Sequence, residues 1–188
     1  MFSLDADEVM SPYLTKFLEK LCVGGASGKR SNSREVGGYL VKRSLVFLNK
    51  KLRFGKTVDH PLRLFKKGSG EFIGAIHEKV ELNPGIRTEK LKVGEILHHS
   101  YEDLADYFER FNRYTSKIAQ NHQDLGHKVP WLLLHILRPW IEFITRYFLR
   151  FGFLDGYAGY CYALVSSFYT FVKYAKFIEL QTNIKQSE

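Results

Sequence analysis

Charged residues recur at every fourth position in the largely apolar and aromatic stretch from Val129 to Phe151, at Arg138, Glu142, Arg146 and Arg150. Residues four apart lie on one side of an α-helix, so this spacing predicts an amphipathic helix. A second stretch, from Tyr157 to Val172, carries no charge, and the glycine-flanked segment 152–156 between the two is expected to turn. We therefore predict an aromatic-rich helical hairpin in residues 126–188.

The uncharged stretch is close to the lower limit of the roughly 17–25 residues that a bilayer span requires. It contains Gly, Ser and several Tyr residues, so it is not strongly apolar. One interpretation is a hairpin that lies on or dips into a membrane surface. The other is a hairpin packed on the rest of the protein or on a partner subunit, and the sequence alone leaves both open.

Strands are predicted upstream of the hairpin. Residues 39–48 carry β-branched and aromatic side chains in loose alternation, which is typical of a strand. Residues 61–67 and 71–80 have a similar pattern, and Gly68-Ser69-Gly70 between them is a typical turn. We expect the second and third of these segments to pair with each other.

Two helices are predicted among these strands. Ser11-Pro12 indicates a helix start, with Ser as N-cap and Pro at the first helical position. A longer helix is expected from Tyr101 to Asn121, with Ser100 as its N-cap. Its buried face is predicted to comprise Leu104, Phe108, Phe111, Thr115 and Ile118. The pattern as a whole predicts an α/β domain in residues 1–125 and a helical tail in residues 126–188.

Composition restricts the class of protein. Among 188 residues, 45% are hydrophobic and 15% aromatic, which is enough for a folded core and excludes a disordered tail. The net charge of +8 favours an anionic partner such as nucleic acid, a phosphorylated sugar or an anionic lipid surface. No recognition-helix, zinc-finger or ribonucleoprotein motif is present, so we expect no biological nucleic-acid partner. Cys22 and Cys161 have no paired spacing and indicate reduced thiols of a cytosolic protein.

An Asp-x-Asp motif, Asp5 and Asp7, follows the short apolar run Phe2–Leu4. If that run is a strand, both carboxylates lie on one face of it. Such a pair can hold Mg²⁺ or Mn²⁺, and the cation can hold a diphosphate. Short acidic triplets are more often solvated turns, so the motif alone is a weak signal.

Further polar residues are candidates for chemistry. Glu78, next to His77 at a predicted strand end, can act as a general base or can be an ordinary surface carboxylate. His98 and His99 can complete an oxygen-rich metal site, although one of them pointing into the core is the simpler interpretation. Arg63 is a candidate for binding phosphate.

Several short segments carry a resemblance when they are taken in order: Ser3–Glu8, Gly38-Tyr39, Leu62–Phe65, Ile76–Glu78, His98–Tyr101, Asn112–Thr115 and Gly152–Gly156. This series is similar to the family 2 glycosyltransferases, in particular to the bacterial branch that acts in lipopolysaccharide-core and surface-glycan synthesis. The resemblance covers nearly the whole chain. It implies the C-terminal half of a GT-A-type nucleotide-diphosphosugar transferase fold, followed by the helical hairpin.

The resemblance also implies an activity. A sugar would pass, with inversion, from a nucleotide-diphosphosugar donor to a lipopolysaccharide-core or related glycolipid acceptor. Mg²⁺ or Mn²⁺ would be bound by Asp5 and Asp7, with His98 or His99 as a later contact. By the same resemblance, Glu78 would deprotonate the acceptor hydroxyl and His77 would orient that base.

The remaining roles concern substrate and location. Arg63, Asn112 and Arg113 are the expected substrate-binding residues. The tail hairpin would hold the enzyme on the cytoplasmic face of the inner membrane, where the glycolipid acceptor lies.

Members of this family have a nucleotide-binding half before the Asp-x-Asp motif, whereas Met1 almost adjoins the motif here. We therefore expect this chain to correspond to the C-terminal part of such an enzyme and not to transfer sugar alone. The alternative is a non-catalytic membrane-surface or partner-binding module derived from such an enzyme.

Overall fold

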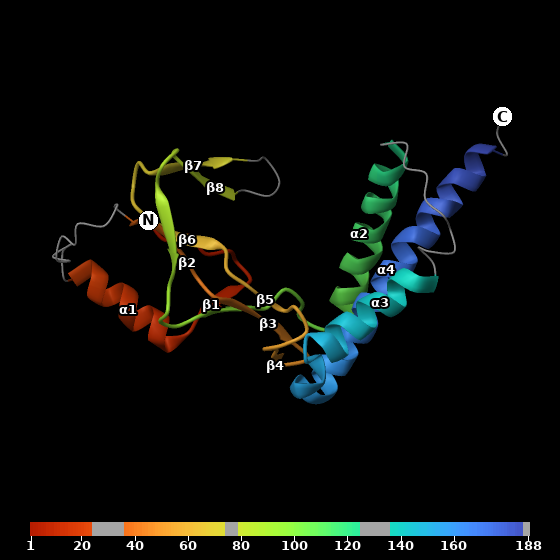
Figure 1. Cartoon of the computed structure of the whole chain (residues 1–188), viewed down its shortest axis with the longest axis horizontal. Helices are drawn as coiled ribbons and strands as arrows, with labels where there is room; N and C mark the ends of the chain where they lie inside the picture. Colours follow the sequence, from red (N-terminus) through yellow and green to blue (C-terminus); the bar gives the residue numbers. More distant parts are fainter. Residues whose placement is uncertain (24–35, 74–78, 125–135, 186–188) are drawn as a thin grey trace. The chain divides into compact units, whose positions relative to one another are not determined.

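The computed structural model describes residues 1–23, 36–73, 79–124 and 136–185. The chain forms two compact units, each described separately below (Figure 1). The first comprises Met1–Leu45 and Val58–Ser100, and the second comprises Val46–Thr57 and Tyr101–Glu188. The second unit thus contains the helix that follows Tyr101, which packs with the C-terminal helices, together with Val46–Thr57.

Short strands and one helix make up the described part of the first unit. Its helix is α1 (Pro12–Val23). Its strands are β1 (Glu8–Met10), β2 (Val36–Leu40), the start of β3 (Arg43–Phe47), β5 (Val58–Asp59), β6 (Leu62–Phe65), β7 (Gly70–Ile73), β8 (Lys79–Leu82), β9 (Arg87–Lys90) and β10 (Ile96–His98).

These strands form several small sheets instead of one large one. β10 lies between β1 and β3, antiparallel to the former and parallel to the latter, and β5 pairs with β3. β2 lies between β6 and β9, antiparallel to β6 and parallel to β9. β7 and β8 form a separate antiparallel pair. The predicted pairing of segment 61–67 with segment 71–80 is therefore wrong, because β6 pairs with β2 and β7 pairs with β8.

Leu14, Val41 and Ile96 form the fully buried core of the first unit. The helix α1 begins at Pro12, as the Ser-Pro pair predicts. The Ser11 hydroxyl, however, accepts a hydrogen bond from the backbone N–H of Glu95 at 2.9 Å. Ser11 thus ties the start of α1 to the chain just before β10.

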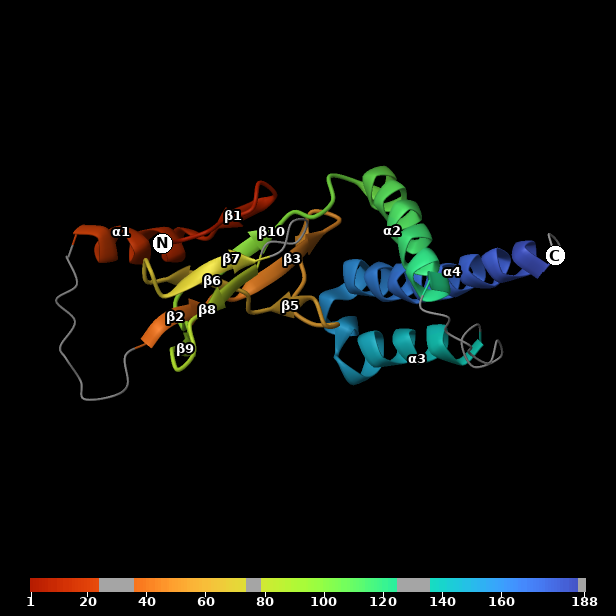
Figure 2. The same ribbon diagram turned by 90° about the horizontal axis from the view of Figure 1, so that it is seen from above.

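The second unit is mainly helical. Its described elements are the short strand β4 (Lys50–Lys51), which pairs with the end of β3, and α2 (Leu104–Asp124), α3 (Arg138–Ile144), a π-helical turn η2 (Thr145–Leu149), a 3₁₀ turn η3 (Gly152–Asp155) and α4 (Gly156–Lys185). Both α2 and α3 pack against the long helix α4 (Figure 2). This confirms a mixed α/β chain with an aromatic-rich helical C-terminal region.

The predicted helix after Ser100 exists, but its start and its buried face differ from the prediction. Asp103, and not Ser100, caps α2, since its carboxylate accepts the N–H of Asp106 at 2.8 Å. The buried residues are Tyr107, Phe111, Thr115 and Ala119. Leu104 and Phe108 are each 43% exposed. The buried face is rotated because α4 supplies the packing surface, with Phe168 stacked on Phe111.

Asp155 joins the helices of the second unit to its β3–β4 segment. Its side chain is buried, and one carboxylate oxygen accepts the backbone N–H groups of Arg53 and Phe54, each at 2.9 Å. Its carbonyl oxygen accepts a hydrogen bond from Lys50 Nζ at 2.6 Å. Hydrogen bonds to a charged group contribute more to stability than neutral ones, so the buried Asp155 carboxylate is expected to be important for the stability of this unit.

Candidate functional site

The Asp-x-Asp motif lies in a turn just before β1, not at the end of a strand. The expectation that Asp5 and Asp7 leave one face of a strand is therefore wrong. Each carboxylate instead has its own basic partner from a distant part of the first unit. Asp5 is bound by Arg63, which lies 58 residues away, and Asp7 contacts His98, which lies 91 residues away.

Glu8, the residue after the motif, is the centre of this cluster. Its side chain is fully buried, and its Oε1 accepts Arg43 Nη1 at 2.8 Å and Arg63 Nη2 at 2.5 Å. Its other oxygen accepts the backbone N–H of Asp5 at 3.1 Å. Glu8 thus joins two guanidinium groups and also fixes the turn that carries the motif.

Arg63 and Asp5 form the tightest pair of the cluster. The guanidinium group contacts both oxygens of the Asp5 carboxylate. Hydrogen bonding to Arg63 holds the pKa of Asp5 below its ordinary value of 3.8. Burial opposes the charge on Arg63, but the hydrogen bonds to Asp5 and Glu8 outweigh burial and raise the pKa of Arg63. In this structure Arg63 orders the motif, and its side chain is only 11% exposed.

The shifted pKa of Asp5 predicts a pH-dependent effect of Asp5→Asn. At pH 7 the variant should lose less than about 1 kcal/mol of stability, because Asp5 is half-exposed. A lowered folded pKa gives a stabilisation that is complete above 3.8 and is lost as the pH falls through the folded value. Urea denaturation should therefore give a constant difference from pH 7 to about 5 that shrinks in more acidic buffer. A difference that grew on acidification would contradict this assignment.

Asp7 and His98 form a second pair. The Asp7 carboxylate lies 3.2 Å from Nε2 of His98, and the two side chains are 39% and 23% exposed. The Ser100 hydroxyl lies 3.0 Å from Nδ1 of the same ring. His99 has an exposed side chain, but its backbone N–H donates to the carbonyl of Asp7 at 2.8 Å.

The fit of a divalent cation depends on these donors. Both oxygens of Asp5 are occupied by Arg63, so Asp5 is poorly placed to be a ligand. Asp7 and His98 offer a carboxylate and an imidazole on side chains that are 39% and 23% exposed, with Nε2 of His98 in contact with Asp7 Oδ2 at 3.2 Å and with the Ser100 hydroxyl at 2.9 Å. Mg²⁺ is commonly held by only one or two protein ligands, with phosphate oxygens and waters completing the shell. Two donors therefore fit such a shared site, although no group of three His, Cys, Asp or Glu ligands occurs among the described residues.

The other predicted site residues fall elsewhere. His77 and Glu78 lie outside the described residues. Asn112 and Arg113 lie on α2 of the second unit, where Oδ1 of Asn112 accepts a hydrogen bond from Lys176 Nζ at 2.6 Å. Arg113 is exposed, and its guanidinium lies 5.7 Å from the centre of the Tyr114 ring. In the described structure Asn112 therefore links α2 to α4.

No role was predicted for Glu8 from the sequence. Arg43 binds Glu8 and also holds Asp59 through two hydrogen bonds of 2.9 and 2.6 Å. The hydrogen bonds to Asp59, followed by those to Glu8, raise the pKa of Arg43. One signal was available: a Glu at the first position of a strand is a candidate partner for an Arg on a neighbouring strand. The sequence could not show which Arg that would be.

No protein-family model matches the chain, and no solved structure matches it. A proposal for the function of this chain therefore uses the motif resemblance and the site geometry described above.

Proposed function

We propose that this chain serves a metal-dependent, inverting glycosyltransferase reaction. The donor would be a nucleotide-diphosphosugar, and the acceptor a lipopolysaccharide-core or related glycolipid. The family 2 glycosyltransferases and a GT-A-type fold remain the best description of the motif order. The site of this reaction would include the Asp-x-Asp turn of the first unit.

One observation supports this proposal most strongly. Three of the segments that carry the resemblance converge in the first unit, although they are far apart in the sequence. Asp5 contacts Arg63, and Asp7 contacts His98. The resemblance implies a metal role for Asp5, Asp7 and His98 and a substrate-binding role for Arg63.

The residues of this cluster have different roles in the proposal. Asp7 and His98 would hold Mg²⁺ or Mn²⁺, which when bound supplies positive charge next to the departing nucleoside diphosphate. Asp5 and Arg63 would fix the turn on which Asp7 lies. Glu78 remains the proposed base for the acceptor hydroxyl, with His77 beside it.

The metal role of Asp7 can be tested by electron paramagnetic resonance of Mn²⁺. Addition of the chain with a nucleoside diphosphate should lower the free Mn²⁺ signal by more than the nucleotide does alone. The variant Asp7→Asn should weaken this binding about tenfold or more, because it removes the charged ligand. Asp124→Asn is the matched control, since Asp124 is exposed at the end of α2. Equal Mn²⁺ binding by the two variants would contradict the proposal.

A second candidate function, contact with a membrane surface, is supported by exposed apolar side chains in the second unit. Trp140 is 65% exposed and Leu149 is 67% exposed. An apolar groove of about 340 Å³ lies beside Trp140 and includes Phe143 and Leu164. No described helix has an apolar stretch sufficient to cross a bilayer. These features support the proposal that α3 and the turn after it lie in the interface of the inner membrane.

Vesicle flotation tests this contact. The double variant Trp140→Ser, Leu149→Ser should lower partitioning onto phosphatidylcholine vesicles by about tenfold to a hundredfold, since two exposed side chains no longer enter the interface. Tyr13→Ser is the control, because Tyr13 is 75% exposed but belongs to α1 of the first unit. If Tyr13→Ser reduced partitioning as much as the double variant, the proposed surface would be wrong.

A further inference from the structure

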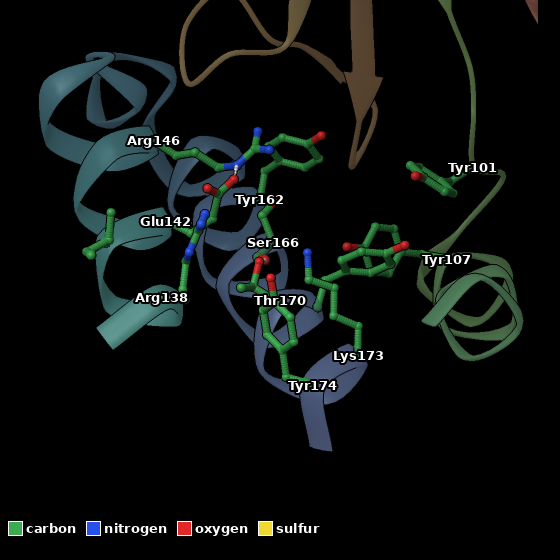
Figure 3. Close-up of a pocket in the computed structure, with 12 residues that line it drawn as sticks. Tyr101, Tyr107, Arg138, Glu142, Arg146, Tyr162, Ser166, Thr170, Lys173 and Tyr174 are labelled. Carbon is green, nitrogen blue, oxygen red and sulfur yellow. Dashed lines mark hydrogen bonds and ion pairs between the residues drawn. The ribbon is translucent and has the colours of Figure 1, made fainter. Parts of the chain in front are cut away.

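A cavity of about 360 Å³ lies within the second unit, lined by residues of α2, α3, α4 and the segments next to them (Figure 3). Arg138, Glu142 and Arg146 project into it from the α3 side. Tyr162, Ser166 and Lys173 of α4 also line it, and Tyr107 lines it from α2. Its volume is near the lower end of the 300–1,000 Å³ range of small-molecule sites.

The charges in this cavity are not balanced. Arg138, Arg146 and Lys173 are cationic, and Glu142 is the single carboxylate among the described lining residues. Glu142 is already paired with Arg146, whose Nε donates to it at 2.6 Å. No ion pair between described residues involves Arg138 or Lys173. The cavity therefore has an excess of two positive charges on groups without an acidic partner among the described residues, and Lys173 Nζ lies 4.8 Å from the centre of the Tyr174 ring.

The pKa of Lys173 is lowered, as expected for an ammonium group in a cavity with excess positive charge. Burial, and then the nearby charge of Arg138, lower the pKa of Lys173, whereas Glu142 compensates only in part. A bound anion would relieve both of these costs.

Neutral hydrogen-bond donors complete the lining. Burial raises the pKa of Tyr101 to about 12 and raises the pKa of Tyr107 as well. Both phenols therefore remain protonated at neutral pH and can donate a hydrogen bond to an anion. The hydroxyls of Ser166 and Thr170 also line the cavity from α4.

We propose that this cavity binds a phosphate group, carried either by a small phosphorylated compound or by a lipid headgroup. Arg138 and Lys173 would contact the phosphate oxygens directly, because planar guanidinium groups and ammonium groups are the common phosphate ligands of proteins. Arg146 would add charge while it remains bound to Glu142. The inference goes beyond the proposed transferase reaction, and every residue that carries it belongs to the second unit.

Calorimetric titration with inorganic pyrophosphate tests the soluble form of the ligand. Arg138→Gln and Lys173→Gln should each weaken binding about tenfold, as expected for loss of one charge-assisted contact. Lys117→Gln is the matched control, because it removes the same charge from an exposed position on α2 and should change the affinity less than about twofold. Arg138→Lys keeps the charge and should retain most of the affinity, which separates loss of binding from loss of folding.

Vesicle binding distinguishes the two sources of phosphate. If the headgroup is the ligand, phosphatidic acid added to phosphatidylcholine vesicles will increase binding, and the two glutamine variants will lose that increase. Dependence on Arg138 and Lys173 with either probe supports the proposal and identifies the source. Absence of binding to both probes, or equal losses in Lys117→Gln and the cavity variants, would overturn it. The Mn²⁺ experiment uses different variants, so either proposal can fail without the other.

Discussion

Replacement of Glu8 by alanine is expected to lower the free energy of unfolding by about 3 kcal/mol, since it removes one partner from a buried charge network. The fully buried Glu8 carboxylate contacts both Arg43 and Arg63. Without it, both guanidinium groups remain in the cluster with less compensation, and the backbone N–H of Asp5 loses its acceptor. Glu8→Gln should cost about half as much, because the amide oxygen can still accept a hydrogen bond. Urea denaturation followed by far-UV circular dichroism would measure both values.

The control for Glu8 is Asp59, the other acidic partner of Arg43. Asp59 makes two short hydrogen bonds to that side chain, yet its own side chain is 56% exposed. Asp59→Asn should therefore cost less than about 1 kcal/mol. If Asp59→Asn destabilised the protein as much as Glu8→Ala, burial would not be the reason for the importance of Glu8.

Replacement of Asp155 by alanine should destabilise the second unit by about 2–4 kcal/mol. The substitution removes the buried carboxylate that accepts the part-buried N–H groups of Arg53 and Phe54, and each hydrogen bond to a charged group contributes about 1.5–3 kcal/mol. Trp140 lies on α3 of the second unit, and the sequence of the first unit contains no tryptophan. Tryptophan fluorescence during urea denaturation therefore reports on this unit directly.

A graded series makes the Asp155 prediction specific. Asp155→Asn retains an oxygen acceptor and should lose less stability than Asp155→Ala. Asp124→Asn changes the same charge at an exposed position and should stay within about 0.5 kcal/mol of the wild type. Equal effects of Asp155→Ala and Asp124→Asn would show that the two backbone contacts are not important for stability.

The helices were largely predictable because their signals are local. The Ser-Pro pair located the start of α1 at Pro12. The periodic charges at residues 138–150 predicted a helix, and Glu142 and Arg146 do form an i,i+4 pair there. The sequence did not predict that this region divides into an α-helix and a π-helical turn. Such irregularities depend on tertiary packing, which hydrophobic periodicity does not describe.

The sheets were less predictable, because strand pairing depends on contacts between distant residues. Gly68-Ser69-Gly70 is a good turn sequence, yet it does not join two paired strands. β6 pairs instead with β2, which precedes it by more than twenty residues in the sequence. Nothing local in either strand specifies that partner.

Some residues of the described cluster were selected from the sequence, but Glu8 at its centre and all of the pairings were not. The sequence selected Asp5, Asp7, Arg63 and His98, and the structure brings these four residues into one unit. The sequence could not show that Arg63 would bind the Asp5 carboxylate and that Asp7 would pair with His98. Because Arg63 binds both oxygens of Asp5, Asp7 is the carboxylate of the Asp-x-Asp motif without an arginine partner in the cluster, although its side chain is less exposed than that of Asp5 (39% against 54%).

Paramagnetic broadening by Mn²⁺ in nuclear magnetic resonance tests the central claim most directly, since it locates a bound cation by residue. In the presence of a nucleoside diphosphate, we expect trace Mn²⁺ to broaden the resonances of Asp7, His98 and their neighbours. Resonances of the second unit, such as those of Asp124, should remain sharp, and Asp7→Asn should abolish the effect. Broadening that was absent from the first unit, or that was unchanged in Asp7→Asn, would contradict a metal site at the Asp-x-Asp turn and the glycosyltransferase proposal with it.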